Sequence, residues 1–173
     1  SKGKSHTTIR GGFKVHNQQN VTFEELTIES HPNGNGLEFY GKETTGNVLK
    51  CTVKKFAAIG LFVRGGATVV ATECEFMENK GHGVQCDPGT KVRLNDCTMH
   101  HNGINGLGVE NTVVDLHGAK TNIHSNRDNG IHACRDAQVN IHLISQHNTS
   151  HDNATQDRSQ EDGASIANIN ADG

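Results

Sequence analysis

The stretch GLFVRGGATVVATECEFMENKGHGVQ, residues 60–85, contains one complete period of a repeat that recurs along the chain. Each copy begins with a glycine, followed by an apolar residue, any residue, and a second apolar or small residue. Seven such glycines are separated by 24, 24, 23, 23, 24 and 33 residues: Gly12, Gly36, Gly60, Gly83, Gly106, Gly130 and Gly163. A period of this length is typical of stacked-coil proteins, in which each repeat buries its apolar side against its neighbours.

Each period also contains a second segment rich in β-branched residues, as at 48–53, 69–76 and 92–99. Apolar and polar residues alternate in these segments, which predicts short strands, and no segment has a sustained helical period. Two or three short strands in each period of 23–24 residues predict one domain, residues 1–173, folded as a parallel β-helix.

Two rows of identical residues fit the stacking of coils. Cys51, Cys74 and Cys97 are each 23 residues apart, so we expect them to lie above one another at the strand spacing of about 4.8 Å. Three asparagines before the glycine strands are 23 and 24 residues apart: Asn79, Asn102 and Asn126. An inward amide at a tight turn can bond to the amides above and below it, which predicts an asparagine ladder at one corner.

These rows, together with the glycine-initiated strands, resemble the right-handed parallel β-helix of the pectate-lyase-like superfamily. More narrowly, they are similar to the parallel β-helix repeats of carbohydrate-binding proteins and sugar hydrolases. The resemblance extends from Ile9 to Ile169. It implies an all-β, right-handed, single-stranded solenoid of about seven coils. It implies no single activity, because the superfamily includes polysaccharide lyases, polygalacturonases, alginate epimerases, phage tailspikes and non-catalytic modules.

The composition suits a narrow coil and excludes some partners. Twenty glycines, six phenylalanines and no tryptophan are a poor basis for a core of large side chains. A net charge of −3 gives no electrostatic argument for nucleic acid or an anionic membrane. No apolar run approaches the roughly 20 residues of a membrane span. Both ends of the chain are polar, so we expect either a piece of a larger protein or a homo-oligomer that covers the uncapped ends.

The chain has five cysteines. Cys86 and the row of Cys51, Cys74 and Cys97 are expected to point inward as small apolar residues. One disulfide between stacked neighbours is an alternative, since their spacing falls within the disulfide range. A zinc site is disfavoured, because paired C-x₂-C spacing is missing. Cys134 is expected to face outward as the reactive thiol.

Side chains at the second and fourth positions after each glycine should face outward, because successive strand residues alternate. The last copy would contribute Ser165 and Ala167 to these rows. The ligand-binding residues that we expect on this face are Tyr40, Phe62, Arg64, Gln85, Asp87, Glu110 and His132.

Arg64, Asp87 and Glu110 should lie on successive coils, about 5 Å apart. The two carboxylates could hold Ca²⁺ or act as an acid and a base, and Arg64 could bind a sugar carboxylate. The simpler alternative is a solvated row in which Arg64 neutralises Asp87.

Three other features were weighed. Gly81-His82-Gly83 matches a motif of polygalacturonases, but the positions before neighbouring glycines hold Asn35, Ile59 and Asn105 instead of carboxylates, which favours a simple turn. The row His100, His124 and His147 indicates either a transition-metal site or a solvent-facing stripe. The polar stretch 149–162 predicts a protruding loop.

The leading hypothesis is a non-catalytic module that binds a polysaccharide or a protein partner on its exposed strand face. The alternative is a polysaccharide lyase or epimerase acting on an acidic polysaccharide, with Arg64, Asp87, Glu110 and His132 as catalytic candidates. A fibre or virion-surface assembly follows if the open ends stack. No cofactor is indicated; Ca²⁺, held by Asp87 and Glu110, enters only with the enzyme hypothesis. No targeting segment is visible, so the sequence assigns no compartment.

Overall fold

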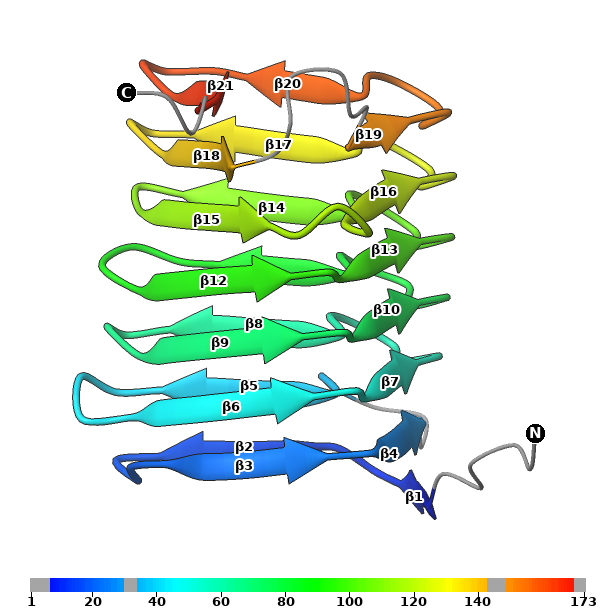
Figure 1. Ribbon diagram of the computed structural model, residues 1–173, viewed down its shortest axis with the longest axis vertical. Helices are drawn as coiled ribbons and strands as arrows, with labels where there is room; N and C mark the ends of the chain where they lie inside the picture. The colour runs from blue at the N-terminus through cyan, green and yellow to red at the C-terminus, as the bar shows by residue number, and fades with distance from the viewer. Residues whose placement is uncertain (1–6, 30–33, 143–148, 170–173) are drawn as a thin grey trace.

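The chain forms a right-handed parallel β-helix. The computed structural model describes residues 7–29, 34–142 and 149–169. The chain rises coil by coil from the blue strands to the red ones, and three short strands of each coil add to three parallel sheets (Figure 1). In these residues every strand pair is parallel, and no helix there is long and apolar enough to span a membrane.

Each sheet contains seven strands. The first sheet consists of β1 (Thr7–Arg10), β4 (Leu26–Glu29), β7 (Thr52–Lys54), β10 (Glu75–Met77), β13 (Thr98–His100), β16 (Asn122–His124) and β19 (Ser150–His151). The glycine sheet consists of β2 (Phe13–His16), β5 (Leu37–Tyr40), β8 (Leu61–Arg64), β11 (Val84–Cys86), β14 (Leu107–Glu110), β17 (Ile131–Cys134) and β20 (Arg158–Gln160). The third sheet consists of β3 (Val21–Glu24), β6 (Thr45–Leu49), β9 (Thr68–Thr72), β12 (Lys91–Asn95), β15 (Val113–His117), β18 (Gln138–His142) and β21 (Ser165–Asn168).

The repeated glycines are required by the close approach of the next coil. A Cβ atom at Gly36, Gly60, Gly83 or Gly106 would lie 2.5, 2.6, 2.7 or 2.9 Å from the carbonyl oxygen of the following glycine in the repeat. A backbone oxygen cannot move away without breaking its own strand pairing. The sequence repeat therefore marks the places where two coils touch through their backbones.

The predicted asparagine ladder is confirmed, and it has a fourth member, Asn153. Asn79 donates from its backbone and side-chain nitrogens to Oδ1 of Asn102, at 3.2 and 3.1 Å. Asn102 repeats both bonds to Asn126 at 3.1 and 3.0 Å, and Asn126 repeats them to Asn153 at 3.1 and 2.9 Å. Asn79, Asn102 and Asn126 are at most 1% exposed, so the ladder satisfies amides that water cannot reach.

The interior is a narrow apolar column. Its members face inward at every second position of the strands, and Cys51, Cys74, Cys86 and Cys97 are buried among them. The inward direction predicted for these four cysteines is thus confirmed. All five cysteines are free, so the alternative of a disulfide between stacked neighbours is not found.

The sequence prediction for the last coil is wrong in two respects. Gly163 does not begin a glycine-sheet strand: it lies in a turn with a φ of +79°, and β21 pairs with β18 in the third sheet. The strand that continues the glycine sheet is β20, which pairs with β17. Ser165 and Ala167 therefore lie on another sheet than the outward rows predicted for them.

The stretch 149–162 is not a protruding loop, since it contains both β19 and β20. The register pairs Ile131 with Arg158, which makes this coil 27 residues long. Asp157 consequently occupies the position that a glycine has in the other coils. The added length falls in the connection between β18 and β19, which includes residues 143–148 outside the described ranges.

Candidate ligand-binding face

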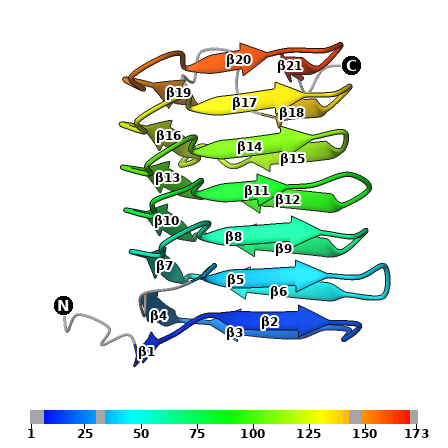
Figure 2. The same ribbon diagram turned by 180° about the vertical axis from the view of Figure 1, so that it is seen from behind.

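The outer face of the glycine sheet brings the predicted site residues together. This sheet faces the viewer in Figure 2. The register pairs Tyr40 with Arg64, Phe62 with Gln85, and Gly108 with His132. Asp87 directly follows β11, and its backbone nitrogen donates to the carbonyl oxygen of Val63 at 2.9 Å. The two outward rows expected from strand alternation are thus present up to β17.

A buried carboxylate, Glu38, lies between two cations at one end of this face. Arg64 donates from Nε and Nη2 to Oε1 of Glu38, at 2.9 and 2.6 Å, and Nζ of Lys14 lies 3.3 Å from Oε2. Glu38 is only 4% exposed. Burial by itself would raise the pKa of Glu38, but the bonds from Arg64, Lys14 and Asn35 lower it overall. The expectation that Arg64 neutralises Asp87 is wrong, because Arg64 pairs with Glu38.

Aromatic rings and the Arg64 guanidinium form a stacked platform beside this ion pair. The rings of His16 and Tyr40 are parallel within 4°, with centroids 4.0 Å apart. The guanidinium carbon of Arg64 lies 4.7 Å from the Tyr40 ring centroid and 5.6 Å from that of Phe62. These contacts hold the guanidinium flat over two rings, so the platform is rigid and partly apolar.

A gap in the side-chain row lies at Gly108, between Gln85 and His132. A Cβ atom at Gly108 would lie 2.2 Å from Oε1 of Gln85 and 3.4 Å from Nδ1 of His82. The Nδ1 atoms of His82 and His132 are buried and have no hydrogen-bond partner. Burial, and then the neighbouring His132, lowers the pKa of His82. His82 comes from the turn before β11, which the sequence gave no reason to place in a site.

The two carboxylates of the predicted site already have partners. Gln85 donates from Nε2 to Oδ1 of Asp87 at 3.2 Å, and Glu110 forms an ion pair with Arg135. Burial, and more weakly the charge of Glu110, raises the pKa of Asp87. A Ca²⁺ ion would have to displace Gln85 and Arg135 from these oxygens, so a calcium site stays a prediction.

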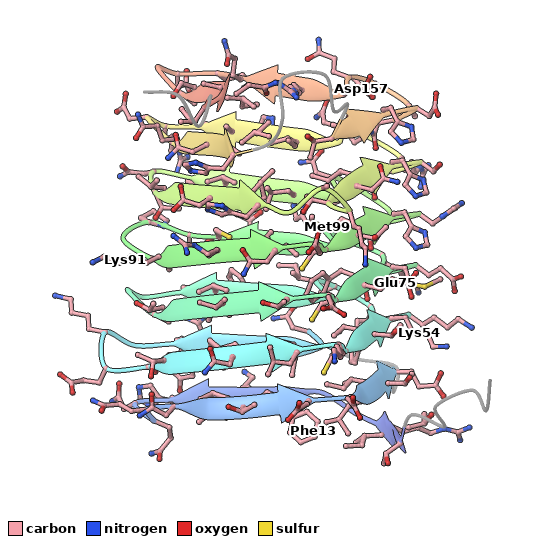
Figure 3. All side chains as sticks on the ribbon, in the orientation of Figure 1. Phe13, Lys54, Glu75, Lys91, Met99 and Asp157 are labelled. Carbon is pink, nitrogen blue, oxygen red and sulfur yellow. The ribbon has the colours of Figure 1, made fainter. Side chains whose placement is uncertain are left out.

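The histidine row on the first sheet differs from the predicted one in its third member. The register pairs His100 with His124 and His124 with His151, whereas His147 lies outside the described residues. The stacked ring centroids are 5.0 and 5.4 Å apart. Nε2 of His100 lies 3.0 Å from Oε1 of Glu75, whose side chain projects away from β10 (Figure 3).

Comparison with known proteins gives one family. A family model described as "Right handed beta helix region" matches residues 4–149, well over half of the chain. No curated protein and no solved structure matches the chain.

Proposed function

Because the chain belongs to the right-handed β-helix family, whose members share a scaffold and no single reaction, we propose that this protein is a non-catalytic module that binds a polysaccharide on the outer face of the glycine sheet. The sheet presents its side chains at a regular spacing of about 4.8 Å over successive coils. An extended polymer can therefore contact several coils at once, as is common for the surfaces of repeat proteins.

The gap at Gly108 is the observation that carries this proposal. His82 and His132 each have a buried Nδ1 without a partner there. Leaving a buried polar atom unpaired costs about 1–3 kcal/mol. Sugar hydroxyls are small groups that both donate and accept hydrogen bonds, so a hydroxyl placed in the gap can satisfy these nitrogens. Gln85 and Asp87 add further hydrogen-bonding groups at the edge of the gap.

The platform of Tyr40, Phe62 and Arg64 supports the same class of ligand. Sugar rings have C–H faces that pack on apolar surfaces and hydroxyl edges that need polar partners. The platform offers the first kind of surface, and the gap two coils further on offers the second. Acidic and basic side chains are both present on the face, so it favours a neutral or weakly acidic polymer over a densely charged one.

One observation favours an enzyme as the second candidate function. The raised pKa of Asp87, beside Glu110, suits a group that exchanges protons. In a polysaccharide lyase or epimerase, Arg64 would bind the sugar carboxylate, while Asp87, Glu110 and His132 would move the proton. The partners of Arg64 and Glu110, which are Glu38 and Arg135, argue for the binding module instead.

The test is proton NMR of neutral and uronate polysaccharides with the purified protein, with and without Ca²⁺. We expect broadened sugar lines and no new sugar signals. Gly108→Val should abolish the broadening, because the added side chain fills the gap against the flexible end of Gln85. Asn122→Ala, on the outward side of the first sheet, is the matched control and should bind like the wild type.

The other outcomes separate the alternatives. New unsaturated or epimerised sugar signals that disappear in Asp87→Asn would establish the enzyme and overturn the non-catalytic proposal. Unchanged sugar lines over the whole panel would overturn both, and would leave a protein as the partner to be sought. Circular dichroism of each variant shows whether the fold is retained.

A further inference from the structure

The outer face of the third sheet holds a cluster that the proposed function does not use. Asp115 and His117 are two residues apart on β15, so both point to the same side of the sheet. His142 on β18 is the register partner of His117. This sheet faces the viewer in Figure 1, and the glycine sheet lies behind it. The cluster is therefore separate from the proposed saccharide face.

The donor atoms of the cluster lie close together. Nε2 of His142 is 3.2 Å from Oδ1 of Asp115. The rings of His117 and His142 are parallel within 3°, and their centroids are 4.2 Å apart. One ligand atom from each of the three residues lies within 4.8 Å of the other two. Donors on one tetrahedral zinc ion are about 3.4 Å apart, so the rings need only tilt toward each other at their outer edges.

An unpartnered atom indicates that something is meant to bind here. Nε2 of His117 is buried and has no hydrogen-bond partner among the described residues. Asp115, in contrast, is held in place: Nδ2 of Asn140 donates to its Oδ1 at 3.0 Å. An oriented carboxylate beside a nitrogen lone pair without a donor is the arrangement that a cation completes, because ligating carboxylates are commonly fixed by such a second hydrogen bond.

We propose that Asp115, His117 and His142 form a binding site for a divalent transition-metal ion such as zinc. Two imidazoles and one carboxylate suit borderline metal ions better than Ca²⁺ or Mg²⁺, which prefer oxygen ligands. Three protein ligands leave at least one coordination position open. The site differs from the stacked histidines of the first sheet, which were the metal candidates in the sequence.

The surroundings of the site predict how it behaves. A hollow of about 360 Å³ adjoins it, lined by Asp115 itself, by apolar side chains such as Val70 and Val113, and by Lys91 and Arg93. Arg93 on β12 is the register partner of Asp115, and its positive charge opposes a bound cation. An open coordination position beside two cationic side chains would take a small anion or water as its fourth ligand.

The test is titration of the untagged protein with Zn²⁺ by calorimetry, and with Co²⁺ by visible absorption. We expect one ion per chain, and Co²⁺ bands typical of four or five ligands. His117→Gln and Asp115→Asn should each weaken binding by about tenfold or more. Arg93→Gln should tighten it, since that change removes the opposing charge. His124→Gln, in the other histidine row, is the matched control and should bind as the wild type does.

Two results would overturn the proposal. One is an absence of Zn²⁺ binding at about 0.1 mM, where a site with three protein ligands should be occupied. The other is binding that His124→Gln abolishes and that His117→Gln leaves intact, which would place the ion on the first sheet. The melting temperature of each variant without metal shows that it folds. Neither result bears on saccharide binding, because the two faces share no residue.

Discussion

Glu38 and Cys134 show how neighbouring coils set the chemistry of single residues on the glycine sheet. Glu38 is kept charged although it is buried, because Arg64 and Lys14 approach it from the coils on either side. Cys134 has the opposite surroundings. It is the register partner of Glu110, and it is the only cysteine among the five that is not fully buried.

We predict that a thiol reagent modifies Cys134 alone in the folded protein, and slowly. Burial, and after it the carboxylate of Glu110, raises the pKa of Cys134, so less thiolate is present at about pH 8 than in the unfolded chain. The labelling rate should therefore rise at a higher pH than it does in denaturant. Glu110→Gln should move the curve to lower pH and speed labelling at about pH 8.

Glu43→Gln is the control for this prediction, because Glu43 is an exposed carboxylate that bonds to Gln19. Labelling sites are read by peptide mass spectrometry. A pH profile that is identical for Glu110→Gln and the wild type would show that Glu110 does not influence the thiol.

At the scale of the element, the glycine that begins each strand is explained by distance. A Cβ atom at Gly83 would meet the Gly106 carbonyl oxygen and Nδ2 of Asn102, both at 2.7 Å. At Gly108 it would meet first the flexible end of Gln85. Gly83→Ala should therefore destabilise the fold by about 2 kcal/mol, a typical cost of overpacking, whereas Gly108→Ala should cost less than about 1 kcal/mol.

Urea unfolding followed by circular dichroism measures both variants, compared at equal slope. The two substitutions are chemically identical and lie in the same sheet, so each controls for the other. Equal losses of stability would mean that the approach of the coils does not decide where glycine is needed.

The same distances explain what the sequence could predict of the fold. Glycine spacing located six strands of the glycine sheet, because a backbone contact allows no other residue there. It failed at the last coil, where Asp157 replaces the glycine and a longer connection shifts the register. Gly163 then imitated the motif for a different reason, a positive φ in a turn.

The candidate site was less predictable, for a geometric reason. Strand alternation shows which side chains share a face, and the register shows which ones are adjacent. It does not show which neighbour a long side chain selects: Arg64 turns to Glu38 on the previous coil and not to Asp87 on the next. The metal-binding candidate shares this limit, since His117 and His142 are 25 residues apart, outside the 23–24 residue rows.

At the scale of the whole molecule, each coil is stabilised by its contacts with the coils above and below it. Central strands such as β8 have fully buried inward residues, whereas β1 and β21 are largely exposed. The asparagine ladder ends at Asn153, whose amide groups bond to the side chain of Asp157 instead of to another asparagine. Phe13 lies at the opposite end, in the lowest coil of Figure 3, with Phe23 5.1 Å away.

We predict a gradient of amide hydrogen exchange along the helix axis. Stability in a stacked array is close to a sum over neighbouring coils, so a coil with one neighbour opens more readily than a coil with two. Amides in β8, β11 and β14 should be the most protected, and protection should fall toward β1 and β21. Exchange measured by mass spectrometry at two protein concentrations tests this. Uniform protection at both concentrations would mean that the coils unfold only together. Protection of the end coils that is lost on dilution would instead show that a second copy of the chain covers them.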